Sequence, residues 1–234
     1  STAPPLPGQS CSITFSAAPG GATPRNLFVP VTFTLLAVLT CFGFISCVGK
    51  VIQSSRKRRM HDCTTRLVRL YSSAVYDPLR ALVHGTCVLP HGISALIPGQ
   101  KLAGEIFTID GHYEVGQDPH STLLSWSTVL SKAPSGKVLI CQPNTYEVAL
   151  MGELSSEVLK NKGVKGYIVD GATRDVSFIL ENKFPTFCRF NTPKDIVGRW
   201  VAKTMGEPIE IGGVSINSGD YVIADLDGVV IIPR

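Results

Sequence analysis

The sequence predicts a mixed α/β domain over residues 64–234. Segments with apolar residues at helical spacing alternate there with short apolar strands. Turns containing glycine or proline separate the segments. Of the 234 residues in the chain, 44% are hydrophobic, which is enough to build a buried core. No repeat of fixed period is present, and this excludes solenoid folds.

The N-terminal part of the chain has a different composition. Residues 1–26 are rich in Ser, Pro, Gly and Ala without apolar periodicity, so we predict a disordered tail. Residues 27–49 carry no charge and are long enough to cross a bilayer as a helix, which predicts a transmembrane segment. Residues 50–63 form a basic linker. Because the basic residues follow the apolar run, an anchored domain on the cytoplasmic side is favoured.

Two alternatives for residues 27–49 remain open, namely the core of a signal peptide and a buried helix of the globular domain.

The net charge of +4 also has a local origin. Residues 56–59 are four consecutive basic residues, so without them the positive and negative charges balance. The domain therefore lacks the basic excess of a nucleic-acid-binding surface. The seven cysteines include no CxxC pair, which favours reduced packing residues over a zinc site.

The first elements of the domain are predicted from apolar spacing and turns. Residues 64–84 show helical spacing, with a break at Asp77-Pro78 where a second helix could start. A Pro-Gly turn inside 97–109 leads into a strand. Residues 120–130 are helical, and residues 137–141 are a short buried strand.

The second half of the domain continues the alternation and ends in strands. Residues 154–162 form a helix that stops at Gly163, and a strand follows at 166–170. A short helix at 176–182 and a strand at 184–190 come next. The C-terminal stretch, IEIGGVSINSGDYVIADLDGVVIIPR, is predicted to be strands separated by glycine turns, with Asp225 and Asp227 as hairpin residues. Histidines 84, 91, 112 and 120 are predicted to be surface or packing residues.

The segment MGELSSEVLKNKGVKGYIVDGATRD, residues 151–175, is the most informative for function. A glycine turn enters a helix here, and free N–H groups at a helix start can hold a carboxylate or an oxyanion. Arg174 and Asp175 follow the next strand, where ligands bind on open α/β sheets. Arginine suits a carboxylate, and aspartate suits a divalent cation. The alternative is a solvated pair in a turn.

This segment, together with FPTFCRFNTPKD and IGGVSINSGDYVIADLDGVVIIP, resembles the RraA-like family, which includes 4-hydroxy-4-methyl-2-oxoglutarate aldolases and oxaloacetate decarboxylases. The family pattern has an acidic residue or glycine, then twenty intervening residues, then Arg-Asp, and Glu153 and Arg174 have that spacing. The segment DGHYEVGQDPH departs from the pattern, which leaves the substrate preference open.

The resemblance implies a fold similar to the swivelling phosphohistidine domain, assembled as a homotrimer or hexamer with sites between subunits. It implies that Arg174 holds the carboxylate or enolate oxygen of a 2-oxo acid and that Asp175 binds Mg²⁺ or Mn²⁺. Gly152, Glu153, Leu154 and Ser155 would grip the pyruvyl end through backbone N–H groups.

The expected activity is that of a metal-dependent carbon–carbon lyase. It would cleave small 2-oxo acids to pyruvate, by retro-aldol cleavage or by decarboxylation of oxaloacetate. The alternative is a regulator that binds an RNA-degrading enzyme or another protein without catalysis. A quinone methyltransferase is excluded because no glycine-rich nucleotide loop follows an early strand.

Overall fold

The structure, a computed structural model, describes residues 63–82 and 86–234. The chain divides into two compact units, residues 1–51 and residues 52–234, and the described residues all belong to the second. The predicted tail, the predicted membrane segment and all of the basic linker except Cys63 lie outside the described residues. Within those residues, no helix combines the length and the apolar character that crossing a membrane requires.

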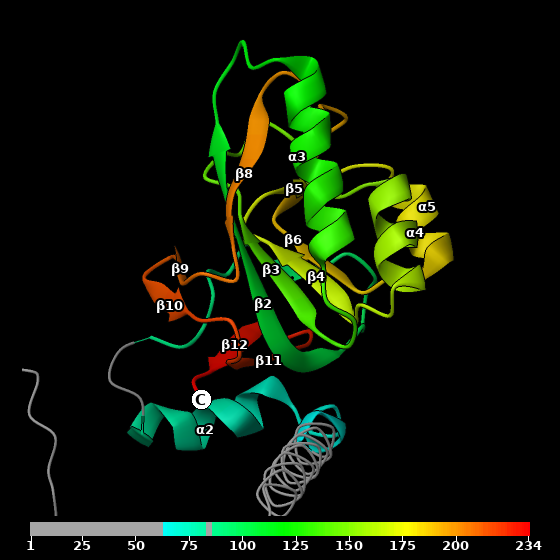
Figure 1. Cartoon of the computed structure of the whole chain (residues 1–234). Helices are drawn as coiled ribbons and strands as arrows, with labels where there is room; N and C mark the ends of the chain where they lie inside the picture. The colour runs from blue at the N-terminus through cyan, green and yellow to red at the C-terminus, as the bar shows by residue number, and fades with distance from the viewer. Residues whose placement is uncertain (1–62, 83–85) are drawn as a thin grey trace, which may run out of the picture. The chain divides into compact units, whose positions relative to one another are not determined.

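The described residues fold around one mixed sheet of eight strands (Figure 1). Seven of them lie side by side in the order β1 (Ser94–Ala95), β6 (Thr186–Cys188), β4 (Gly166–Val169), β3 (Val138–Gln142), β2 (Leu102–Tyr113), β11 (Tyr221–Ala224) and β12 (Val229–Ile232). The eighth, β8 (Trp200–Met205), pairs with the far end of β2. Strands β2, β3, β4 and β6 are parallel, so their carboxyl ends lie at one edge.

Three helices pack on one face of the sheet, as Figure 1 shows. They are α3 (Pro119–Lys132), α4 (Glu153–Asn161) and α5 (Val176–Asn182). The hairpin of β9 (Ile209–Ile211) and β10 (Val214–Ile216) packs on the other face. A two-stranded sheet of β5 (Ala172–Thr173) and β7 (Phe190–Asn191) lies beyond the carboxyl ends of β4 and β6. Both α4 and α5 therefore begin close to that edge.

Strand β3 shows how the sequence builds both faces. Its residues are all apolar up to Gln142 because the strand is covered on both sides. Side chains alternate along a strand, so Leu139 and Cys141 join the core under the helices, whereas Val138 and Ile140 join the core under the hairpin. The apolar run KVLIC thus fixes the central strand.

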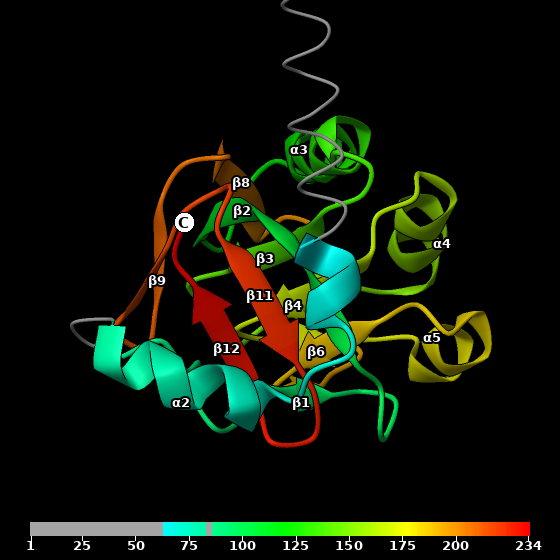
Figure 2. The same ribbon diagram turned by 90° about the horizontal axis from the view of Figure 1, so that it is seen from below.

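A further helix, α2 (Ser72–Leu82), lies beside β12 at the end of the molecule that Figure 2 shows. The backbone N–H and the hydroxyl of Ser72 both donate to Asp225, over 2.7 and 2.6 Å. Asp225 also accepts the N–H of Asp227 at 3.1 Å. Both aspartates thus have the structural role that was predicted for the β11–β12 turn.

The predicted helix break at Asp77-Pro78 is wrong. A helical turn ends at Leu67, the break covers residues 68–71, and Pro78 lies inside α2. Because proline has no backbone N–H, Pro78 cannot donate the intrahelical hydrogen bond to the carbonyl of Ala74. Helix α2 continues because its start is held by Asp225 and because Val75 is buried against β11 and β12.

Strand β8 was not predicted, and β2 extends beyond its predicted end to Tyr113. The two are paired through the unusual segment DGHY, with a register shift between Asp110 and Gly111. A Cβ atom at Gly111 would lie 1.9 Å from the ring of Trp200, which is fully buried and donates to the carbonyl of Pro143 at 2.9 Å. Gly111 therefore makes room for a core tryptophan.

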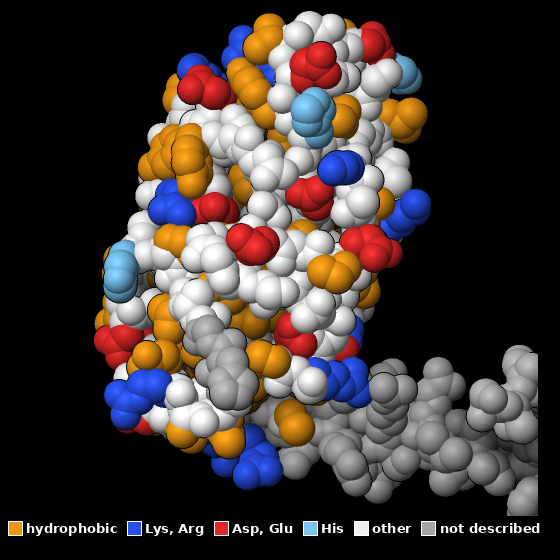
Figure 3. Space-filling view, turned by 90° about the vertical axis from the view of Figure 1, so that its left-hand side faces the viewer, with side chains coloured by type: hydrophobic (Ala, Val, Ile, Leu, Met, Phe, Trp, Pro, Cys, Tyr) orange, Lys and Arg blue, Asp and Glu red, His pale blue; other side chains and the backbone are white. Residues whose placement is uncertain are grey.

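The single strand predicted over residues 184–190 is instead two short strands, because β6 pairs with β4 in the main sheet and β7 pairs with β5 in the two-stranded sheet. The helices predicted at 120–130, 154–162 and 176–182 and the strands predicted at 137–141, 166–170 and in the C-terminal stretch are confirmed, with ends that differ by a few residues. On the face shown in Figure 3, acidic, basic and apolar side chains are interspersed. This face carries no stripe of basic side chains of the kind that follows a nucleic-acid backbone.

Candidate active site

The candidate site begins at the loop that enters α4. The N–H of Leu150 donates to the carbonyl of Ala172 at 3.0 Å, and the N–H of Arg174 donates to the carbonyl of Met151 at 2.9 Å. Two segments that are more than twenty residues apart in the sequence are thereby joined as neighbouring extended chains. This pairing brings Gly152, at the start of α4, to the side of Arg174.

Asp175 is attached to the start of α4. Its Oδ2 atom accepts the backbone N–H of Glu153 at 3.0 Å and lies 3.3 Å from Nε of Arg174. Asp175 has a left-handed backbone, with φ of 54°, directly before α5. Aspartate adopts this conformation more readily than most residues, and such conformations gather at functional sites. The bend between β5 and α5 thus turns the carboxylate towards α4.

The guanidinium of Arg174 lies between two carboxylates. Nε contacts Asp175, and a terminal nitrogen lies 3.6 Å from Oδ2 of Asp195. The Arg174 side chain is 38% exposed, and those of Asp175 and Asp195 are 35% and 50% exposed. These groups are therefore open to a ligand from solvent. Asp195 was not predicted as a site residue, although it lies within the quoted segment FPTFCRFNTPKD.

A cavity of about 250 Å³ connects these groups. All six predicted site residues line it, which are Gly152, Glu153, Leu154, Ser155, Arg174 and Asp175. Its remaining wall is largely apolar and comes from α3, from the chain before Gly152 and from the chain after Asp195. A shallower hollow of about 440 Å³ shares Arg174 and Asp175 and is bounded by residues 191–193, which were not predicted as site residues.

Glu153, Leu154 and Ser155 form the first turn of α4, so their N–H groups have no carbonyl partner within the helix. The carboxylate of Asp175 accepts the N–H of Glu153. The hydroxyl of Ser155 is turned inward and accepts the indole N–H of Trp126 at 2.9 Å, while the side chain of Leu154 is 74% exposed. These two residues can therefore offer a ligand their backbone N–H groups.

The described residues contain no group of three or more His, Cys, Asp or Glu side chains that could hold a metal ion. Magnesium needs fewer protein ligands, because it keeps several waters and is commonly held by one or two carboxylates together with the substrate. The hydrogen bonds described above engage Oδ2 of Asp175. No hydrogen bond in the described part of the chain reaches Oδ1. Asp175, whose side chain is 35% exposed, thus has one hard oxygen without a hydrogen bond from the described residues, and this donor fits a hydrated Mg²⁺ or Mn²⁺.

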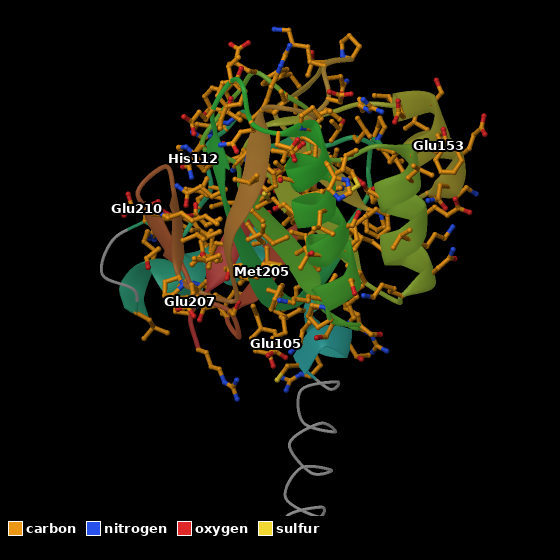
Figure 4. The ribbon with its side chains drawn as sticks, turned by 45° about the horizontal axis from the view of Figure 1, so that its top comes forward. Glu105, His112, Glu153, Met205, Glu207 and Glu210 are labelled. Atoms are coloured by element: carbon orange, nitrogen blue, oxygen red, sulfur yellow. The ribbon has the colours of Figure 1, made fainter. Side chains whose placement is uncertain are left out.

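The other reactive side chains lie elsewhere. Figure 4 places His112 and Glu210 on the opposite side of the molecule from Glu153. None of the histidines within residues 63–82 and 86–234 lines the cavity. Burial raises the pKa of the Cys141 thiol to about 12 and also raises the pKa of Cys188. Both thiols therefore stay protonated and are poor nucleophiles.

Residues 72–231 match the family model described as RraA-like, Aldolase/RraA. The chain belongs to the RraA-like family. The match runs from the start of α2 into β12 and includes all the residues that line the cavity.

Individual relatives are distant. Protein DlpA of Legionella pneumophila is 26% identical over 199 residues, which are 81% of this chain and 31% of DlpA. A protein of Halalkalibacterium halodurans named "Putative 4-hydroxy-4-methyl-2-oxoglutarate aldolase" is 33% identical over 106 residues, 44% of this chain and 48% of that protein. The chain thus spans less than half the length of either relative.

Solved structures support the fold. The crystal structure of Streptomyces coelicolor RraAS2, described as an unusual member of the RNase ES inhibitor RraA protein family, superimposes with a TM-score of 0.64. The two chains are 28% identical, and the alignment covers 73% of this chain and 84% of that one. The RraA-like family thus contains proteins named as aldolases and proteins named as ribonuclease inhibitors.

Proposed function

We propose that this protein is a divalent-metal-dependent lyase that cleaves small 2-oxo acids to pyruvate. The substrates would be 4-hydroxy-4-methyl-2-oxoglutarate, oxaloacetate or both. The observation that supports this most is the convergence of Arg174, Asp175 and the N-terminus of α4 on one cavity. These groups come from two loops and present a cation, a hard oxygen and free N–H groups to the same space.

The carboxylate of a 2-oxo acid fits the positive part of this cavity. The first turn of α4 offers N–H groups with the partial positive charge of a helix N-terminus. Arg174 can donate two parallel hydrogen bonds to a carboxylate, since Asp175 and Asp195 contact only part of its fork. The substrate would thus be held at its pyruvyl end.

Asp175 would hold Mg²⁺ or Mn²⁺ through Oδ1 and through waters. A divalent ion held there would supply Lewis-acid chemistry that polarises the 2-oxo group. Arg174 then stabilises the negative charge that grows on the enolate oxygen. The apolar wall formed by α3 and residues 196–197 limits access of water to the enolate.

Pyruvate release from each of the two substrates tests this function. The wild-type protein should release pyruvate from at least one of them in the presence of Mg²⁺ and lose the activity in excess chelator. Arg174→Ala should lower kcat/KM by about 10²–10³, which is typical for the loss of one group that stabilises an oxyanion.

Asp227→Asn is a suitable control because Asp227 is exposed in the β11–β12 turn and does not line the cavity. It should keep wild-type activity. If the wild-type protein cleaves neither substrate, or if Arg174→Ala is as active as the wild type, the lyase function is wrong.

A second candidate is a regulator that binds an RNA-degrading enzyme. It is favoured by the similarity to RraAS2, whose family is described as ribonuclease inhibitors. Inhibition of a purified ribonuclease E type enzyme by the wild-type protein, unchanged by Arg174→Ala, would support this candidate. The cavity would then have no part in the function.

We further propose a homotrimer or hexamer located in the cytoplasm and held at a membrane by residues 27–49. Exposed leucines 123 and 154 on α3 and α4 favour association, because they line the cavity and place apolar surface around it. Sedimentation equilibrium would give at least three times the 25.1 kDa of one chain, and a monomer would contradict the proposed assembly.

A further inference from the structure

Retro-aldol cleavage requires a group that decarboxylation of oxaloacetate does not require. In the aldol substrate, a base must remove the proton of the 4-hydroxyl group as the bond between C3 and C4 breaks. Oxaloacetate carries a carboxylate at the corresponding place and loses CO₂ without a base. The geometry points to Asp195 as the general base for aldol cleavage, an inference that rests on the proposed lyase function.

Asp195 faces the group that would hold the substrate. Its Oδ2 atom lies 3.6 Å from a terminal nitrogen of Arg174, and both residues line the 250 Å³ cavity. A ligand hydrogen-bonded to Arg174 therefore lies beside the Asp195 carboxylate. Asp195 comes from the chain between β7 and β8, so it reaches the cavity from a different segment than Arg174 and the start of α4.

The carboxylate of Asp195 is held in place. Its Oδ1 atom accepts the N–H of Val197 at 3.1 Å. The preceding residue, Lys194, accepts the N–H of Ala149 at 2.9 Å, which ties this segment to the chain that enters α4. Oδ2 accepts no hydrogen bond within the described residues and has only the Arg174 nitrogen at 3.6 Å beside it, so it can accept the substrate hydroxyl. The side chain is 50% exposed, so a proton taken up here can pass to solvent. A general base needs this combination of fixed position and proton exit.

The cavity lining contains two other carboxylates, those of Asp175 and Glu153. Asp175 already accepts the N–H of Glu153 and is the proposed metal ligand. Within the described residues, no hydrogen bond or ion pair orients the carboxylate of Glu153, which is exposed. Asp195 is thus the carboxylate that is both oriented and free of another proposed role.

The reaction balances with this assignment. Asp195 takes the proton of the 4-hydroxyl group, and the O–H electron pair forms the new carbonyl at C4. The C3–C4 bond breaks, and its electrons form the enolate over C2 and C3. The part containing C4 leaves as pyruvate. The enolate takes a proton from water at C3 and becomes a second pyruvate, while Asp195 returns its proton to solvent.

The test compares the two substrates in Asp195→Asn. Asparagine keeps the acceptor for Val197 and the size of the side chain but cannot take up a proton. The kcat for aldol cleavage should fall by about 10²–10⁴ relative to the kcat for oxaloacetate decarboxylation, because only aldol cleavage uses the base and this is the usual contribution of a general base. Asp195→Glu, which keeps a carboxylate, should recover part of the aldol activity.

The outcomes separate this inference from the proposed function. A wild-type protein that cleaves neither substrate rejects both. If the wild type cleaves the aldol substrate and Asp195→Asn affects both reactions equally or neither, only the role of Asp195 is rejected. Loss of aldol cleavage alone in Glu153→Gln, with Asp195→Asn still active, would reject Asp195 and assign the base to Glu153. If the wild type cleaves oxaloacetate but not the aldol substrate, the role of Asp195 is rejected as well.

Discussion

At Gly152 the segment that enters α4 comes very close to the segment that carries Arg174 and Asp175. A Cβ atom at this position would lie 2.5 Å from Oδ2 of Asp175 and 3.2 Å from Cγ of Arg174. The backbone of Gly152 is extended, with φ of −158°, which any residue can adopt. The need for glycine therefore comes from the space that the Asp175 carboxylate occupies beside the start of α4.

We predict that Gly152→Ala lowers activity without unfolding the protein. The added methyl group would push the Asp175 carboxylate away from the N–H of Glu153, because a short side chain moves more easily than the backbone. We expect kcat/KM to fall at least tenfold and the apparent Mg²⁺ affinity to weaken. The melting temperature should change by only a few degrees, which corresponds to about 1 kcal/mol.

Pyruvate release titrated with Mg²⁺, together with thermal unfolding, checks this prediction. Wild-type activity in Gly152→Ala would show that Asp175 does not need its present position. A large loss of stability would show instead that the contact supports the fold.

The same residues show what spacing along the chain can predict. Twenty residues lie between Glu153 and Arg174, and this spacing identified both loops, because a family pattern records residues at a fixed separation along the chain. No fixed spacing of this kind marked Asp195 as a site residue. It reaches Arg174 from an irregular connection between β7 and β8, and only the folded chain brings it within 3.6 Å.

At the scale of elements, α2 depends on a distant hairpin. Helix α2 contains Pro78, so much of its stability must come from contacts outside the helix. Asp225 supplies a contact by accepting the N–H and the hydroxyl of Ser72. Burial by itself raises the pKa of Asp225, but the hydrogen bonds from Ser72 and Asp227 outweigh it and lower the pKa below 3.8.

We predict that this contact makes stability depend on pH in acid. Because the pKa of Asp225 is lower in the folded state, its contribution is complete above the ordinary aspartate value and is lost as the pH falls through the folded pKa. Ser72→Ala removes one hydrogen bond to a charged group and should lower the free energy of unfolding by about 1.5–3 kcal/mol at pH 7. The difference from wild type should shrink below about pH 4.

Urea unfolding of wild type and Ser72→Ala at neutral and acid pH measures the effect. Ser215→Ala is the matched control, since Ser215 is exposed on β10. A difference between wild type and Ser72→Ala that is the same at both pH values would show that the charge of Asp225 plays no part.

The helices and strands that were predicted well carry strong local signals. Asp118 precedes α3 and caps it, because its carboxylate accepts the N–H of Ser121 at 2.8 Å, and Pro119 is the first residue of the helix. Strand β8 has no such signal. Only Trp200 is fully buried in it, and its remaining residues are half-exposed or exposed, so no clear alternation marks it as a strand.

At the scale of the whole molecule, the sheet determines where the site lies. Strands β3 and β4 are parallel and adjacent, with α4 between them in sequence. The chain after β3 and the chain after β4 must therefore leave the sheet at the same edge. Arg174 and the start of α4 meet there, on the side that carries the three packed helices.

The N-terminal segment leads to a prediction at this scale. We predict that the full chain is recovered with membranes, because residues 27–49 are uncharged over a length that spans a bilayer. A chain lacking residues 1–59 should be recovered in the soluble fraction with unchanged lyase activity. Recovery of both chains in the soluble fraction would contradict an anchor.

The sequence by itself determined the α/β class, most of the elements, the family resemblance and the six residues around Gly152 and Arg174. These features depend on local spacing, on turns and on fixed separations along the chain. The tertiary structure decided the start of α2, the pairing of β8 with β2 and the place of Asp195 opposite Arg174. Each of these depends on a contact between residues far apart in sequence, and such contacts form only when the sheet brings the segments together.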